Sequence, residues 1–150
     1  MKTSRRNFLA AAGGVGFALT LPPARATRAT MQDAIRKVVG DAPLRPGKVR
    51  LDVPPLIDNG NAVALTVSVE SAMTQVDHVK AIHVFTEKNP QPNVLSVYLG
   101  PRAGRAGFTT RVRLADTQTV IAIAQLNDGS VWLDSKDVVV TIAACLEEIG

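Results

Sequence analysis

The sequence has 150 residues, which is room for one domain, and 46% of them are hydrophobic. It contains 17 Lys and Arg against 13 Asp and Glu, but four of the basic residues and none of the acidic ones lie within residues 1–26. The 13 basic residues that follow balance the 13 acidic ones. The excess positive charge therefore belongs to the N-terminal segment and does not indicate nucleic-acid binding, which needs a clustered positive surface.

Residues 1–26 have the features of an export signal. Paired arginines precede a short apolar stretch, and the small-residue motif at 24–26 is typical of a cleavage site. The apolar stretch is too short and too rich in Gly and Ala to span a bilayer, so we expect no membrane association of the mature form. The letters SRRNFL (4–9) resemble a twin-arginine signal, which implies periplasmic export of a folded protein, and an ordinary secretory signal is the alternative. We expect the mature domain to span 27–150.

The first expected element of the mature chain is a helix over 31–39. Thr30 is the expected N-cap, and Asp33 is expected in the first turn. Gly40 is expected to end the helix. Four apolar residues recur on one face: Met31, Ile35, Val38 and Val39.

The rest of the chain alternates between strand-like segments and turns. Segment 63–70 alternates apolar and polar residues, as a half-buried strand does, whereas 118–126 is apolar throughout, as in a central strand. Asn127-Asp128-Gly129 is a hairpin signal. The pattern favours an all-β fold, an immunoglobulin-like antiparallel β-sandwich with a short N-terminal helix, and a small barrel is the alternative. The expected strands are 48–53, 63–70, 78–87, 94–100, 108–114, 118–126, 130–133 and 137–144.

Motifs of common enzyme sites are missing from the sequence, which has no Gly-rich phosphate loop, no H-E-x-x-H and no G-x-S-x-G. Its two histidines, His78 and His83, are five residues apart, so on one strand they point to opposite faces and would not share a metal ion. We expect His78 near a strand end and His83 packed beside Phe85. The residues thus predict no cofactor and no metal site.

Cys145 is the only cysteine, so an internal disulfide is excluded. In an exported protein, a lone cysteine indicates pairing with another chain or a thiol kept for chemistry, and a buried inert residue is the alternative. If the strand over 137–144 continues, Cys145 shares the face of Thr141, which is the more solvated one. If the strand stops earlier, the thiol lies on a loose terminus. Both outcomes favour an accessible thiol.

The mature chain resembles the SoxY family of sulfur-oxidation carrier subunits. The resemblance runs from about Met31 to Cys145, and its most specific stretches are HVKAIHVFTEKNPQPNV, GRAGFTTRVRLADTQTVIAIAQLNDGSVW and DVVVTI. It implies an immunoglobulin-like β-sandwich that forms a heterodimer with a second β-sandwich subunit, SoxZ. It also implies a carrier that is not itself an enzyme.

The resemblance also implies a role for Cys145, which follows VVVTI as the family's cysteine does. That cysteine holds thiosulfate-derived intermediates covalently for periplasmic partner enzymes such as SoxAX, SoxB and SoxCD-like proteins. The family's usual ending is Gly-Gly-Cys-Gly-Gly, but here Ala143-Ala144 and Leu146 flank the cysteine, which narrows the conformational range of the tail. Glu147 and Glu148 are expected to disfavour the thiolate.

Two other readings of the sequence stay open beside the carrier hypothesis. The chain could be an interaction subunit with the SoxY fold and a packed or vestigial Cys145. It could also be a periplasmic metal-binding β-sandwich that uses Cys145 with one histidine.

Overall fold

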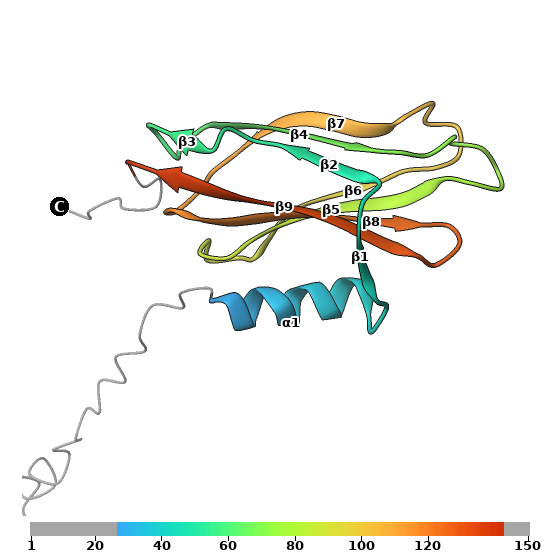
Figure 1. Ribbon diagram of the computed structural model, residues 1–150, viewed down its shortest axis with the longest axis horizontal. Helices are drawn as coiled ribbons and strands as arrows, with labels where there is room; N and C mark the ends of the chain where they lie inside the picture. Colours follow the sequence, from blue (N-terminus) through green and yellow to red (C-terminus); the bar gives the residue numbers. More distant parts are fainter. Residues whose placement is uncertain (1–26, 143–150) are drawn as a thin grey trace, which may run out of the picture.

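The computed structural model describes residues 27–142, and residues 1–26 and 143–150 lie outside the described part. Between 27 and 142 the chain forms one helix followed by nine strands, which pack as a β-sandwich with the helix on its outside (Figure 1). In chain order the elements are α1 (Arg28–Val39), β1 (Leu44–Pro46), β2 (Val49–Asp52), β3 (Leu56–Ile57), β4 (Val63–Val69), β5 (Val79–Thr86), β6 (Asn93–Tyr98), β7 (Ala106–Val112), β8 (Gln118–Leu126) and β9 (Val131–Val140).

The two sheets differ in size. The large sheet has the order β1-β9-β8-β5-β6, with β3 also paired to β9, and the small sheet has the order β2-β4-β7. Most neighbours are antiparallel, but the short strands β1 and β3 both run parallel to β9. This architecture confirms the predicted immunoglobulin-like sandwich with its short N-terminal helix. The predicted signal segment lies outside the described residues.

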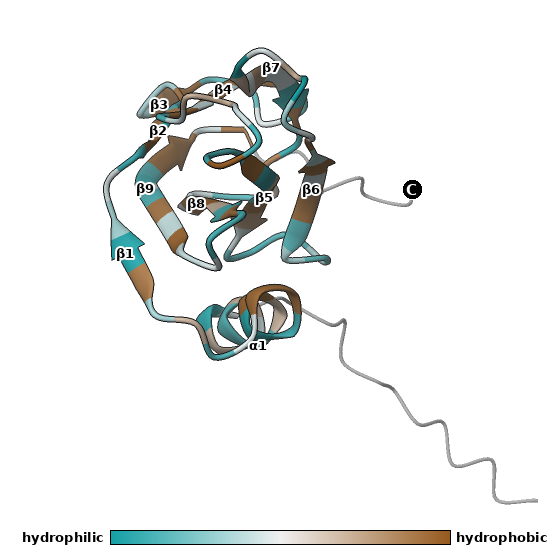
Figure 2. Cartoon of the chain, turned by 90° about the vertical axis from the view of Figure 1, so that its right-hand side faces the viewer, coloured by the Kyte–Doolittle hydropathy of each residue, from teal (hydrophilic) through white to brown (hydrophobic). Residues whose placement is uncertain are grey.

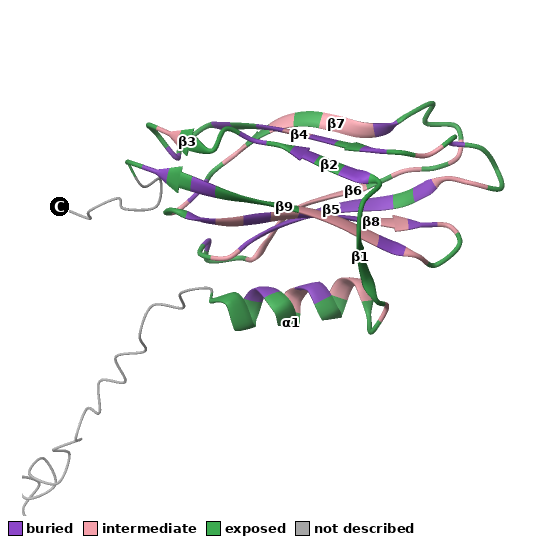
Figure 3. Ribbon diagram, in the orientation of Figure 1, coloured by how far each residue is buried: buried purple, intermediate pink, exposed green. Residues whose placement is uncertain are grey.

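The space between the sheets is filled by the apolar faces that the alternation predicted. Along β4, Val63, Leu65, Val67 and Val69 are all buried, while Ala64 and Ser68 are exposed (Figure 3). Burying one Val or Leu side chain contributes about 1.5–3 kcal/mol, so this shared interior supplies most of the stabilisation of the sandwich.

Helix α1 packs on the outer face of the large sheet (Figure 2). Met31 and Ile35 of the helix cluster with Phe85, Ile123 and Val131. Strands β5 and β8 are therefore covered on both faces, which explains their nearly continuous apolar sequences. Within residues 27–142 no helix has the length and apolarity that a bilayer crossing requires.

The predicted start of the helix was wrong by three residues. The N-cap is Thr27, whose hydroxyl accepts a hydrogen bond from the Thr30 backbone N–H (3.3 Å), while the Thr30 hydroxyl accepts one from the Thr27 N–H (2.6 Å). This reciprocal capping box lengthens the helix and leaves Asp33 beyond its first turn. Gly40 follows the helix with φ of +68°, so the predicted end is confirmed.

Three differences concern the strands. β1 and β3 were not predicted, and the segments expected as two strands at 130–133 and 137–144 form the single strand β9, which ends at Val140. The polar residues between those segments keep their place in the ladder, because Asp134 and Ser135 lie opposite Ala122 and Ile121 of β8. A polar interruption in the sequence therefore did not interrupt the strand.

Candidate functional site

The predicted attachment residue Cys145 lies outside the described residues. The structure describes the segment that precedes it, which ends at Ile142. Thr141 and Ile142 are the last described residues before it, and they directly follow β9. Four segments meet at this end of the sandwich: the turns 58–62, 87–92 and 113–117, and the end of β9 (Figure 1). We call this end of the molecule the exit end.

One side of β9 is held at the exit end by β3. The Val139 N–H donates to the carbonyl of Pro55 (2.9 Å), and the Thr141 N–H donates to that of Ile57 (3.0 Å). The Thr141 hydroxyl also donates to the carbonyl of Asp58 (3.0 Å). The chain is thus paired beyond the formal end of the strand.

The other side of β9 and its final residue are held by the turns. The Thr117 hydroxyl accepts from the Val140 N–H (3.0 Å). The carbonyl of Ile142 accepts from the Gly60 N–H (3.0 Å), and the carbonyl of Gly60 accepts from the Leu114 N–H (2.9 Å). The chain is therefore hydrogen-bonded through Ile142.

A buried pair of amides ties two turns of the exit end together. Asn89 and Gln118 are 7% and 4% exposed. The Asn89 Nδ2 donates to the Arg113 carbonyl (2.8 Å), and its Oδ1 accepts from the Ala115 N–H (2.9 Å) and the Gln118 Nε2 (3.0 Å). Gln118 Oε1 accepts from the Lys88 N–H (2.7 Å). Sequence reasoning missed this network.

Charged side chains at the exit end are mostly paired. Lys88 Nζ lies 3.4 Å from Asp116 Oδ2, and Arg28 Nε lies 3.4 Å from Glu87 Oε1. Arg113 differs, because among residues 27–142 it has no carboxylate partner within 4.0 Å. Asp58 of the turn 58–62 likewise has no ion-pair partner within 4.0 Å among these residues, and both side chains are exposed.

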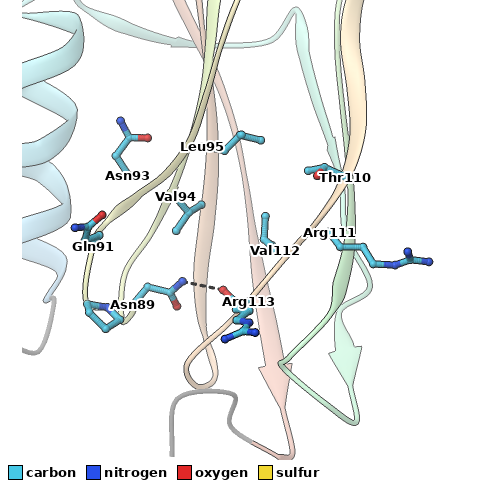
Figure 4. A pocket seen from close by; sticks show the side chains of 10 residues that line it. Asn89, Gln91, Asn93, Val94, Leu95, Thr110, Arg111, Val112 and Arg113 are labelled. Carbon is cyan, nitrogen blue, oxygen red and sulfur yellow. Dashed lines mark hydrogen bonds between the residues drawn. The ribbon is translucent and has the colours of Figure 1, made fainter.

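An open groove of about 460 Å³ starts at the exit end and runs between β6 and β7, the edge strands of the large and small sheets (Figure 4). Its apolar lining comes from Val94 and Leu95 of β6 and Val112 of β7, all half-buried. Asn89 and Arg113 lie together at one end of it (Figure 4). We call it the β6–β7 groove.

The histidines lie where the sequence predicted them. His78 immediately precedes β5, and its Nδ1 lies 3.0 Å from the Thr74 carbonyl oxygen. His83 is buried in the middle of β5, with its ring centroid 6.3 Å from that of Phe85. Each histidine has its own partners, and residues 27–142 contain no group of three or more His, Cys, Asp or Glu that could hold a metal ion.

His83 links the edge strand β6 to the interior of the large sheet. Its Nδ1 lies 2.7 Å from the Ser96 hydroxyl of β6, and its Nε2 lies 3.2 Å from Gln125 Oε1 of β8. Burial lowers the pKa of His83, because desolvation penalises the charged ring, and the hydrogen bond to Gln125 partly opposes this. The imidazole therefore links β5 to β6 and β8, and its burial favours the neutral form.

The comparisons with known proteins agree with this geometry. A family model described as the sulfur oxidation protein SoxY matches residues 35–145. The structure of the sulfur carrier protein SoxY from Chlorobium limicola f thiosulfatophilum aligns with a TM-score of 0.65 and 26% sequence identity, covering 76% of this chain and 98% of that one. A search of curated protein sequences found no match.

Superoxide reductases are also structurally similar. The enzyme from Ignicoccus hospitalis aligns with a TM-score of 0.56 at 16% identity, covering 63% of this chain and 80% of that one. The enzyme from Nanoarchaeum equitans aligns with a TM-score of 0.53 at 11% identity, covering 64% and 100%. At these identities the likeness shows a shared fold alone.

Proposed function

We propose that this chain, which belongs to the SoxY family of sulfur oxidation proteins, is a periplasmic carrier that holds a sulfur substrate covalently on Cys145. The observation that carries the proposal is the family match, which covers most of the chain and extends through Cys145. The likeness to a solved sulfur carrier protein over 98% of that protein's length supports it. In this role the chain is not an enzyme, because partner proteins perform the reactions on its cargo.

The chemistry of attachment needs a thiolate and an external oxidant. Joining the Cys145 sulfur to the outer sulfur of thiosulfate forms an S–S bond and releases two electrons, which a partner oxidoreductase must accept. Further partners then oxidise and hydrolyse the bound group, which regenerates the carrier. SoxAX, SoxB and SoxCD-like proteins are the proposed partners for these steps.

The exit end supplies a fixed base for such a tether. The chain is hydrogen-bonded through Ile142, and the three residues from there to Cys145 span at most about 11 Å. A partner enzyme that receives the cargo must therefore approach the exit end itself. The turns and charges of that end are the surface that such a partner meets.

A SoxZ-like subunit is the proposed permanent partner. Leu56 and Val139, which lie side by side in the parallel pair β3 and β9, are 61% and 48% exposed, and Ile142 nearby is 61% exposed. Contiguous exposed apolar side chains are typical of protein interaction sites. We propose that the partner covers this apolar group beside the tether.

The test is the intact mass of the mature chain with its SoxZ-like partner, after incubation with thiosulfate and the cognate oxidising enzymes. We expect an added mass that corresponds to a thiosulfate-derived adduct and that is removed by a disulfide reductant. Cys145→Ser is the matched control, because it changes one atom at the sequence's only cysteine and must abolish the adduct.

The other possible results of that experiment would contradict the assigned site or favour one of the two alternative functions. An adduct that persists in Cys145→Ser would contradict the assignment of the site. No adduct on the wild type, together with slow thiol labelling, would favour the interaction subunit with a packed cysteine. A bound metal in native mass spectra that is lost in Cys145→Ser would favour the metal-binding alternative.

A further inference from the structure

We propose that the open edge of β7 is a docking site for an extended segment of another protein, in which acidic residues alternate with apolar ones. The docked segment adds to the small sheet as a further strand. The inference goes beyond the proposed function and does not depend on whether Cys145 carries sulfur.

The first argument is that the chain itself already pairs one position of this edge. Within residues 27–142, β7 is bonded to a strand on one side only, that of β4. Just past the end of β7, the Asn89 Nδ2 donates to the Arg113 carbonyl (2.8 Å), and the Asn89 Oδ1 accepts from the Ala115 N–H (2.9 Å). One side-chain amide thus supplies the donor and the acceptor that a neighbouring strand supplies in a sheet.

The second argument is the direction of the backbone groups along β7 itself. Successive strand residues direct these groups to alternate edges. The Leu114 N–H bonds to Gly60 on the β4 side (2.9 Å), whereas the Arg113 carbonyl points away from β4. By this alternation Thr109 and Arg111 also direct their N–H and carbonyl groups away from β4, and no strand within residues 27–142 pairs with them there.

The third argument is the charge of the segment that carries this edge. Between Glu87 and Asp116 the sequence has five basic residues and no acidic one, so neither β6 nor β7 contains a carboxylate. Lys88 is paired with Asp116. The other four are exposed and have no ion-pair partner within residues 27–142: Arg102, Arg105, Arg111 and Arg113. Since the neighbouring strand β4 has no charged residue either, the edge attracts a negatively charged partner.

The fourth argument is the alternation of the two faces at this edge. Arg111 and Arg113 are exposed, whereas Val112 between them is half-buried and lines the β6–β7 groove with Val94 and Leu95 (Figure 4). Side chains directly opposite each other in a ladder share a face of the sheet. In an added strand, acidic residues therefore match the arginines, and the apolar residues between them face the groove.

The open backbone favours a polypeptide over a nucleic acid as the occupant. A phosphate backbone can bind the arginines, but it has no N–H group to donate to the carbonyls of Thr109 and Arg111. A peptide backbone supplies donors and acceptors at the spacing that the edge requires. Charged residues on an edge strand can also serve only to prevent pairing between copies, and the experiment has to separate that role from docking.

The first test titrates the isotope-labelled mature chain with the heptapeptide Glu-Val-Glu-Val-Glu-Val-Glu. We expect NMR shift changes at the Thr109 and Arg111 amides, and hydrogen exchange of both N–H groups that slows about tenfold at a peptide concentration about ten times the Kd. The matched control peptide carries an N-methyl group on each glutamate, which keeps the charge and removes the donors that face β7. It should bind more weakly and should not slow the exchange.

The second test changes the arginines and leaves the backbone of β7 untouched. In Arg111→Gln/Arg113→Gln we expect the Kd for the heptapeptide to rise about two- to tenfold, the size of two exposed ion pairs. Arg50→Gln is the matched control, because Arg50 is an exposed arginine on β2, at the other edge of the same sheet. It should leave the Kd unchanged.

Four results would overturn the proposal. The absence of peptide binding would leave the arginines only the role of preventing pairing between copies. Equal binding and equal slowing of exchange by the N-methylated peptide would mean that charge alone is recognised. An equal rise in Kd in Arg50→Gln would place the binding elsewhere. Tighter binding of a single-stranded oligothymidine at the same amides would assign the surface to nucleic acid.

Discussion

The two long sides of the sandwich are closed in different ways. On the β9 side, the short strands β1 and β3 pair with β9 through their backbones, and the Leu51 N–H of β2 donates to Asp134 Oδ2 of β9 (2.8 Å), which joins the two sheets. On the other side, β6 and β7 both remain edge strands and a groove separates them. Both extra strands thus pair with β9 on one side, whereas on the other side β6 and β7 each keep an unpaired edge among the described residues.

The sides also differ in the kind of interaction that holds them. Both sides contain backbone ladders, which on the open side join β6 to β5 and β7 to β4, but the open side also has side-chain links, namely the Asn89–Gln118 amides and the link from His83 to Ser96. A backbone ladder survives most substitutions, but a side-chain hydrogen bond is lost with its residue. We therefore expect single substitutions to affect the open side more strongly.

The largest expected effect is that of Asn89→Ala on the open side. The substitution removes one buried and two partly buried hydrogen bonds and leaves the Ala115 N–H and the Arg113 carbonyl without these partners, which should lower the free energy of unfolding by about 2–4 kcal/mol. Urea unfolding measures this change in the free energy of unfolding. Gln91→Ala, an exposed residue of the same turn, is the control and should change stability by less than about 0.5 kcal/mol. Equal effects of the two variants would refute the role of the network.

The next effect is that of Asp134→Ala on the closed side. The Leu51 N–H loses its acceptor, and the expected cost in unfolding free energy is about 1–3 kcal/mol. Asp134→Asn keeps an acceptor oxygen and should recover most of that loss. If Asn destabilises as much as Ala, the hydrogen bond between the sheets is not what matters at this position. If Asp134→Ala lowers the free energy of unfolding more than Asn89→Ala does, the expected contrast between the two sides is reversed.

The smallest effect is a pH dependence at His83. Its pKa is lowered in the fold from 6.5, so the folded state disfavours the protonated ring. The stabilisation is fully present above about pH 6.5 and is lost as pH falls from there toward the lowered pKa. Chemical unfolding at pH 7.5 and 5.5 should show a larger loss for the wild type than for His83→Gln, which retains His78. Identical losses of unfolding free energy in the two proteins would mean that His83 does not contribute to the pH dependence of stability.

The strands that face the shared interior could be predicted from the sequence. In β4 and β7 one face must be buried and the other solvated, so the residues alternate, and β8 is apolar throughout because sheet and helix cover both its faces. β1 and β3 could not be predicted, because strands of three and two residues show no period and exist only through pairing with β9.

The candidate site also has features that could be predicted from the sequence and features that could not. Cys145 could be singled out because its uniqueness and its place after a strand-like segment are properties of the sequence itself, and its role as the attachment site stays a prediction. The Asn89–Gln118 pair was missed, because an asparagine in a turn and a glutamine at a strand start are ordinary until two distant turns meet. The β6–β7 groove was missed for a related reason, since a groove between edges depends on which strands end each sheet.

The parallel pairing of β3 with the end of β9 has a mechanical consequence. A pull on residue 143 acts along β9, while the hydrogen bonds to β3 and β8 lie across that direction. All of those bonds then resist sliding together, instead of opening one after another from the tip. A partner that binds the segment after β9 can thus exert a pulling force on it without detaching β9 from the sheet.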